Sequence, residues 1–326
     1  MTSRKHVAVL LAVLGPFGIG HFHVGRRRRA VLWLAVPAVG LVVLGLLVVA
    51  LGRRIGWTVA VVAAIALVLS AFVLSVVDLV RVAEGPRTPI WQTAVFAAIG
   101  FATPAAASAI LRTFVLESFV VPTRSMEPTV LAGDRIFAAK RGDLPRYGEV
   151  VVLDSPEHPG EMLVKRVVAR PGDVLEMRRG RPWVNGWQVP SCTLGDGELG
   201  SARGEVDVEF LGDASYLVFY DAAAPVAEHA GPLYAAKDAV LVLGDDRNDS
   251  ADSRAWHGGR DGNVHARGLR GRALFVWLRT SAADDARFGV DLARPRLPSS
   301  LARLQPALDR CLATRPPSTP PPGLMR

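Results

Sequence analysis

Cysteine is scarce in this sequence, with two residues, Cys192 and Cys311, in 326. Two cysteines and seven scattered histidines do not form the spaced ligand sets of a zinc site, so we expect no metal centre and no cofactor. His21 and His23 are close together, but a structural role explains them more simply than metal ligation. Internal repeats are also lacking, which argues against a solenoid or another repeat architecture.

Charged residues are nearly absent from long stretches of the first third of the chain. Three apolar runs, at about residues 30–51, 57–80 and 91–115, reach the roughly 20 residues that cross a bilayer. We therefore predict a multi-pass membrane region over residues 1–113. A fourth stretch, residues 7–24, is interrupted by glycine and proline, and we expect a short or re-entrant segment there.

The net charge of +8 does not indicate nucleic-acid binding, because much of the positive charge lies beside the apolar runs. The positive-inside rule places Arg26–Arg29, Arg81 and Arg87 in the cytoplasm, with Arg53 and Arg54 as the main exceptions. This orientation sends everything after about residue 115 to the extracytoplasmic side. The lipid bilayer is thus an expected partner, and nucleic acid is not.

Beyond residue 115 the sequence changes to short β-branched runs bounded by Gly, Pro, Asp and Asn, without alternation of strands and helices. This pattern predicts a mainly β domain over residues 114–280. The expected strands are 134–140, 149–153, 162–169, 174–177, 215–220 and 239–243. Asn185-Gly186 favours a two-residue hairpin turn. Residues 191–238, with an acidic loop at Gly195–Glu198, look like an insertion.

Residues 281–326 are predicted to form a C-terminal extension with a short helix and a Pro-rich, disordered end at Pro316–Pro322. Four leucines, Leu301, Leu304, Leu308 and Leu312, could line one face of the helix. Cys192 and Cys311 both lie outside the membrane in this topology, where disulfides are permitted. We expect a bridge between them, and two free thiols are the alternative.

Three short blocks of the β-rich part carry reactive side chains: Val121–Thr129, Lys165–Asp173 and Gly244–Arg254. Taken singly, they fit a Pro-rich turn, a solvated Lys-Arg strand pair and a polar turn. Together, in this order and over about Phe119–Trp277, they resemble the bacterial type I signal peptidases, also called leader peptidases.

The resemblance implies a Ser-Lys dyad serine protease, with Ser125 as nucleophile and Lys165 as general base. A serine hydroxyl needs an adjacent base, and a lysine amine can act as one only when it is neutral. Burial must then lower the lysine pKa from its ordinary value near 10.4. Alternation along the strand leaves open whether Lys165 or Arg166 points inward.

The resemblance also implies supporting roles for five residues. Thr123 and the backbone N–H of the nucleophile would form the oxyanion hole. Ser250 would hydrogen-bond the lysine amine, with Asp252 and Arg254 as a nearby ion pair. Met126 would pack around the catalytic pair, although it equally fits a role in the core.

The sequence departs from the family pattern at several positions, none of which is Ser125 or Lys165. Arg124 and Ala169 stand where glycine is common, and Asp246 replaces a usual asparagine. Asn248-Asp249 reverses the usual order of these two residues. The departures bear on the turn around Ser250.

We therefore predict a mainly β extracytoplasmic catalytic domain anchored by N-terminal α-helical transmembrane segments in the bacterial cytoplasmic (inner) membrane. The expected activity is that of a serine endopeptidase (signal peptidase I, a hydrolase) that removes N-terminal signal peptides from exported preproteins. As the resemblance implies, cleavage should follow small, uncharged residues at the first and third positions before the scissile bond. The secretion machinery is an expected neighbour.

Two other functions remain open. One is a narrow-duty Ser-Lys processing peptidase that matures a single secretion or conjugation component. The other is an inactive membrane scaffold. Trypsin-like and α/β-hydrolase chemistry are disfavoured, because no Gly-X-Ser-X-Gly motif surrounds Ser125.

Overall fold

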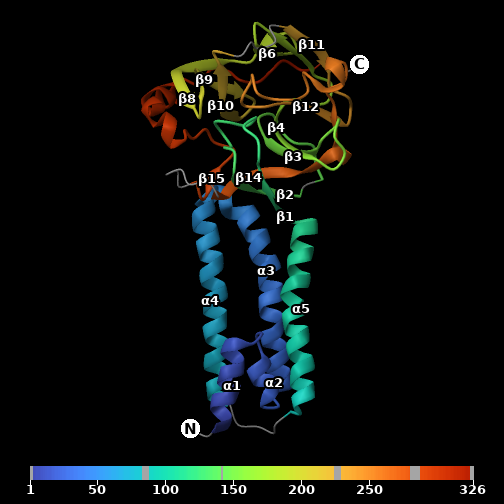
Figure 1. The fold of residues 1–326 in the computed structure, drawn as a ribbon, viewed down its shortest axis with the longest axis vertical. Helices are drawn as coiled ribbons and strands as arrows, with labels where there is room; N and C mark the ends of the chain where they lie inside the picture. The colour runs from blue at the N-terminus through green and yellow to red at the C-terminus, as the bar shows by residue number, and fades with distance from the viewer. Residues whose placement is uncertain (1–2, 83–87, 141, 224–228, 280–286, 324–326) are drawn as a thin grey trace. The chain divides into compact units, whose positions relative to one another are not determined.

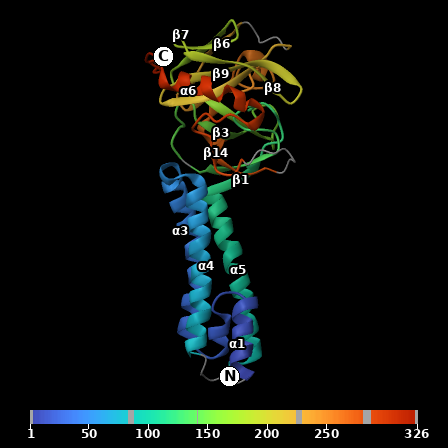
Figure 2. The ribbon, with the colours of Figure 1, turned by 90° about the vertical axis from the view of Figure 1, so that its left-hand side faces the viewer.

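The computed structural model describes residues 3–82, 88–140, 142–223, 229–279 and 287–323 of the chain. Contacts between Cα atoms divide the chain into two compact units, Met1–Leu116 and Glu117–Arg326. The first unit is helical and the second is built mainly from strands (Figures 1 and 2). Arg87 and the start of the predicted C-terminal extension, 281–286, lie outside the described residues.

Three long helices form most of the first unit: α3 (Arg27–Ile55), α4 (Trp57–Val82) and α5 (Ile90–Phe114). They match the three predicted apolar runs, and each is long and apolar enough to cross a membrane. Most of their apolar side chains point outward; Leu67, for example, is 58% exposed. An apolar surface of this extent would be unfavourable in water and suits contact with lipid.

The predicted break within residues 7–24 is present. Helix α1 (Ser3–Leu14) stops before Gly15, and a short helix, α2 (Ile19–His23), follows after a turn. Gly18 has φ of 83°, and a Cβ there would lie 2.3 Å from the carbonyl oxygen of Ala30, so only glycine fits. The depth of this segment in a membrane stays a prediction.

The second unit is organised around an eight-stranded sheet in which the pairs from β2 to β13, and the β14–β15 pair, are antiparallel. Its order is β1-β2-β14-β3-β4-β12-β13, and β15 pairs with β14. The strands are β1 (Leu116–Val120), β2 (Asp134–Ala139), β3 (Val150–Asp154), β4 (Met162–Ala169), β12 (Ala239–Leu243), β13 (Val264–His265), β14 (Leu269–Arg279) and β15 (Val290–Asp291). Both faces are covered: Val150 and Val152 of β3 pack in one apolar cluster, Val151 and Leu153 in another.

Two smaller sheets complete the unit. One has the order β11-β5-β6-β7, from β5 (Val174–Arg178), β6 (Arg181–Val184), β7 (Trp187–Gln188) and β11 (His229–Tyr234). The predicted Asn185-Gly186 hairpin joins β6 to β7, with positive φ at both turn residues. The other has the order β10-β9-β8, from β8 (Ser191–Leu199), β9 (Ala202–Leu211) and β10 (Ala214–Asp221).

The expected acidic loop at Gly195–Glu198 is wrong, because these residues belong to β8 and pair with β9. The glycines that suggested a loop have a packing role instead. A Cβ on Gly197 would lie 2.5 Å from the side chain of Leu301 and 2.8 Å from that of Val206. Glycine therefore lets the C-terminal segment approach the strand closely.

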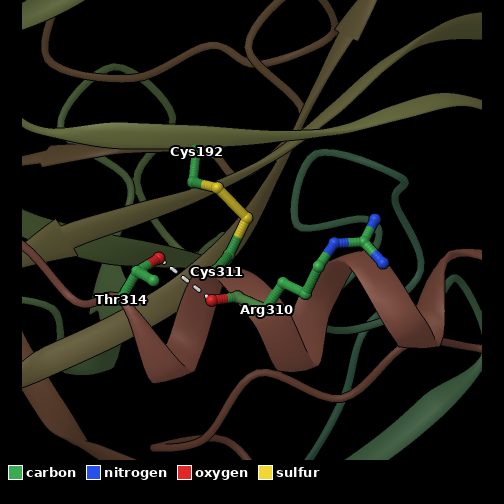
Figure 3. Close-up of a disulfide and its surroundings, with 4 residues drawn as sticks. All are labelled: Cys192, Arg310, Cys311 and Thr314. Carbon is green, nitrogen blue, oxygen red and sulfur yellow. Dashed lines mark hydrogen bonds between the residues drawn. A yellow bond between two sulfur atoms is a disulfide. The ribbon is translucent and has the colours of Figure 1, made fainter.

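The C-terminal segment forms a 3₁₀-helix (Ser299–Leu304) followed by α6 (Gln305–Ala313). Leu301, Leu304 and Leu308 are buried as expected, but Leu312 is 36% exposed and Cys311 completes the buried face. Cys311 lies three residues after Leu308 and seven after Leu304, and its disulfide to Cys192 holds that side of the helix against β8. The expected disulfide joins Cys311 on α6 to Cys192 on β8 (Figure 3).

The Pro-rich end differs from the expected disorder. Residues 316–323 have no regular secondary structure, but they lie against the β-rich unit. Ser318 exchanges two hydrogen bonds with Gly212, and the Asn185 side chain donates to the carbonyl oxygen of Pro321. Proline restricts the unbound chain as well, so few contacts suffice to hold such a segment.

Candidate active site

Ser125 and Lys165 meet inside the second unit. Ser125 lies in the loop between β1 and β2, and Lys165 lies on β4. The Lys165 amine is 2.7 Å from the Ser125 hydroxyl oxygen, and the two residues are 2% and 8% exposed. The structure therefore places a hydroxyl and an amine in direct contact, shielded from bulk solvent.

Burial lowers the pKa of the Lys165 amine to about 8. Two nearby charges act on it in opposite directions: the Asp252 carboxylate raises the pKa and the Arg254 guanidinium lowers it. An amine with this pKa is neutral in a useful fraction of molecules near neutral pH. It can then accept a proton, which an ordinary lysine cannot do at that pH.

The loop that carries Ser125 is closed at its base. The Val121 N–H donates to the Asp134 carbonyl oxygen, and the Gly133 N–H donates to the Val121 carbonyl oxygen. The buried Asp134 carboxylate accepts the Leu131 N–H and pairs with Arg287, whose guanidinium also donates to the Thr129 carbonyl. These contacts fix the backbone on which the serine is presented.

The alternation of side chains along β4 did not show whether Lys165 or Arg166 points inward, and the structure buries both. Lys165 faces Ser125, whereas the Arg166 guanidinium makes two hydrogen bonds, of 2.7 and 2.5 Å, to the Asp245 carboxylate. Arg166 also donates to the Gly148 carbonyl and lies over the ring of Tyr216. A buried arginine needs such a set of partners, so Arg166 has a structural role.

The turn after β12 supplies the expected ion pair. Arg254 donates two hydrogen bonds to the Asp252 carboxylate, which also accepts the Gly244 N–H. Burial would raise the pKa of Asp252, but Arg254 and these hydrogen bonds hold it below the ordinary value. Asp252 therefore stays charged, and its field reaches Lys165.

Ser250 lies beside the pair but does not make the expected contact. Both Ser250 and the backbone of Ser125 adjoin Gly244. A Cβ added to Gly244 would lie 2.2 Å from the Ser250 hydroxyl oxygen and 2.5 Å from the Ser125 carbonyl oxygen. Within the described residues the hydroxyl is buried without a hydrogen-bond partner. The Lys165 amine donates to Ser125 instead, so a bond from Ser250 to the amine is not formed here.

Thr123 and Met126 flank the serine. The Thr123 hydroxyl is 3.3 Å from the Ser125 hydroxyl and reaches the exposed side of the loop. No described group of the main chain accepts the backbone N–H of Ser125, so this N–H can serve a ligand. Met126 is fully buried in a cluster with Phe119 and Ile136, as a core residue would be.

Besides Asp134–Arg287, sequence reasoning missed two buried ion pairs near the site. Arg166–Asp245 is one, and Arg247–Glu209 is the other, with both members of each pair nearly inaccessible. Glu209 lies on β9, far from the turn in sequence. On β9 the only signal was the charged Glu209 between the apolar Val208 and Phe210, which is weak without the fold.

An antiparallel β domain that holds a serine hydroxyl against a buried, pKa-lowered lysine is the arrangement of a Ser-Lys serine peptidase. The sequence model of the family described as "Signal peptidase, peptidase S26" matches residues 90–278, more than half of the chain. The chain belongs to this family.

Several relatives carry matching names. The chain is 31% identical over 193 residues to "Signal peptidase I" of Pseudomonas aeruginosa, covering 52% of this chain and 67% of that protein. It is 32% identical over 190 residues to "Probable signal peptidase I-2" of Synechocystis sp., covering 56% and 67%. The match to "Signal peptidase I P" of Bacillus subtilis subsp. natto has 32% identity over 149 residues, covering 44% and 70%.

Proposed function

We propose that the chain is a membrane-bound serine endopeptidase that removes N-terminal signal peptides from exported preproteins. Membership of the signal peptidase family supports the reaction and the substrate class. The observation that carries the mechanism is the 2.7 Å contact between Lys165 and Ser125, with the pKa of the amine lowered to about 8.

In this mechanism the neutral Lys165 amine removes the hydroxyl proton as Ser125 attacks the scissile carbonyl. The tetrahedral oxyanion receives hydrogen bonds from the Ser125 backbone N–H and the Thr123 hydroxyl. The protonated amine then gives its proton to the leaving nitrogen, which frees the mature protein. Lys165 next activates a water molecule, which hydrolyses the acyl-enzyme and releases the signal peptide.

The placement of the site follows the sequence-based topology. With α3, α4 and α5 as membrane spans, the positive-inside rule puts the second unit on the extracytoplasmic side of the bacterial cytoplasmic membrane. Signal peptides emerge there after export, with the secretion machinery as a neighbour. Small residues at the first and third positions before the cut suit a substrate strand lying close to the enzyme backbone.

Cleavage of several unrelated preproteins by the purified protein tests this proposal. The wild type should cut each at its signal-peptide junction, and Ser125→Ala and Lys165→Ala should abolish cutting while keeping the fold. Ser215→Ala and Lys237→Ala, outside the site, are the matched controls and should retain activity. Cutting of a single preprotein would favour a narrow-duty peptidase, and retained activity in Ser125→Ala would reject the mechanism.

A further inference from the structure

The three-stranded sheet β10-β9-β8 borders a pocket of about 530 Å³ beside the nucleophile loop. Arg124, which precedes Ser125 in sequence, forms one wall. The start of β9 and the end of β10 form another, with Arg203 and Asp221. The third wall is the turn after β12, with Asp246, Asn248 and Asp249.

The pocket is joined directly to the Ser-Lys pair. The backbone N–H of Asp246 donates to the carbonyl oxygen of Ser125, at 3.2 Å. The Asp249 carboxylate is close enough to Lys165 to raise the pKa of its amine, although burial outweighs this effect. An extended peptide advances about 3.3–3.6 Å per residue, so a side chain within a few residues of the scissile bond can reach the pocket.

The two arginines of the pocket are already neutralised by glutamates. The Arg124 guanidinium donates to the Glu127 carboxylate, 3.1 Å away, and to the Leu199 carbonyl. Arg203 forms a 2.8 Å ion pair with Glu198. Both arginines thus already have a carboxylate partner, and neither forms an ion pair with the three aspartates in this structure.

None of the three aspartates forms an ion pair among the residues that the structure describes. Asp246 is 3% exposed, and one of its oxygens accepts the backbone N–H groups of Asn248 and Asp249. Its burial raises the pKa of the carboxyl to about 6. A buried carboxylate without a cation is costly, and a bound cationic group would offset that cost.

We propose that this pocket is a substrate subsite that accepts a basic side chain, lysine or arginine, located within a few residues of the scissile bond. The charged end of such a side chain pairs with Asp221, Asp246 and Asp249, and its long apolar stem lets that end reach them from the substrate strand. The inference rests on the proposed peptidase function. It also gives the predicted insertion at 191–238 a role in substrate selection.

A peptide series tests the subsite. Peptides based on one neutral cleavable sequence would carry a single Lys, Gln or Glu at each flanking position in turn, and kcat/KM would be measured. At one or more positions Lys should exceed Gln by about two- to fivefold, the range of a partly exposed ion pair, and Glu should fall below Gln. Added salt should shrink the advantage.

Asp221→Asn and Asp246→Asn should each reduce the lysine advantage. Asparagine keeps an oxygen that can accept the same hydrogen bonds. At position 221 this is the bond from the Ala223 N–H, and at position 246 it is the pair from the Asn248 and Asp249 N–H groups. Asp196→Asn, which removes a carboxylate from β8 outside the pocket, is the control and should leave the advantage intact.

The neutral parent peptide separates the subsite from the proposed function. Wild type and the control variant Asp196→Asn should cleave it at the same rate. If the wild type cleaves it but no position favours lysine, or if the advantage persists in both pocket variants, the subsite is overturned and the peptidase function stands. Failure of the wild type to cleave any neutral signal-peptide sequence would overturn the peptidase function itself.

Discussion

The chemistry of a single amine depends mainly on its burial and on nearby charges of both signs. Burial lowers the pKa of Lys165 to about 8, Asp252 raises it and Arg254 lowers it. At pH 7 an amine with that pKa is neutral in roughly a tenth of the molecules, against fewer than one in a thousand for an ordinary lysine. The lowered pKa therefore makes general-base catalysis possible without a histidine.

Removal of the Asp252 charge should change this balance measurably. In Asp252→Asn the amide can still accept the Gly244 N–H, but the negative charge that raises the Lys165 pKa is lost. Arg254 then lacks its partner and lowers the pKa further. The acid limb of the rate–pH profile should move to lower pH. An unmoved limb with intact folding would show that the titrating group is not Lys165.

Thr123 can be tested with an isosteric pair. Thr123→Val removes the hydroxyl that lies 3.3 Å from the Ser125 hydroxyl and keeps the shape, so turnover should fall by roughly 10²–10³ if it stabilises the oxyanion. Thr123→Ser keeps the hydroxyl and should stay near the wild-type rate. Equal turnover in all three proteins would assign the oxyanion hole to backbone amides alone.

At the residue scale, motif and order could identify Ser125 and Lys165, but side-chain orientation could not be derived. Both faces of β4 are buried, so a period of two does not separate Lys165 from Arg166. The partner of Arg166 is 79 residues away in sequence. Such a contact depends on tertiary structure, and no local pattern encodes it.

Among the elements, the predicted strands and apolar helices are present where the periodicity is strong. Strand β8 was missed because Gly195, Asp196 and Gly197 carry turn chemistry, and their strand conformation depends on pairing with β9. The side chain of Leu301 fills the space over Gly197. Tertiary packing thus overrides local propensity in this sheet.

The C-terminal helix offers a matched test of that packing. Leu308 is 1% exposed against the β8–β10 sheet, whereas Leu312, one turn later, is 36% exposed. Leu308→Ala should destabilise the second unit by about 2–5 kcal/mol, and Leu312→Ala should cost well under half of that. Thermal or denaturant unfolding measures both, and equal losses would contradict the observed helix face.

The Cys192–Cys311 disulfide is a second constraint on this element. Its members are 119 residues apart, and closure of so long a loop corresponds to about 4–5 kcal/mol in the chain-entropy description. The Leu308 and Leu312 comparison is therefore best made with the disulfide intact, so that the two variants differ only in packing.

For the whole molecule, the change in composition near residue 115 was enough to predict a helical part followed by a β-rich part. Orientation across a membrane rests on charge alone, and it can be tested by cysteine accessibility. The two native cysteines form a disulfide, so a thiol reagent would label only the single cysteine introduced in each variant. Positions 26–29 should react from the cytoplasmic side and positions 142–143 from the outside. Labelling of 142–143 from the cytoplasm would overturn the orientation and the substrate assignment together.

The most direct test of the account is the pH dependence of a chemistry-limited cleavage. Single-turnover cleavage of a neutral signal-peptide substrate by the wild-type protein in detergent would be followed from pH 5 to 10. The account predicts a plateau above about pH 8 and a fall of about tenfold per pH unit below it, because the protonated Lys165 amine cannot accept the Ser125 proton. A rate that stays constant from pH 5 to 9, with chemistry still limiting, would contradict a neutral Lys165 as the general base.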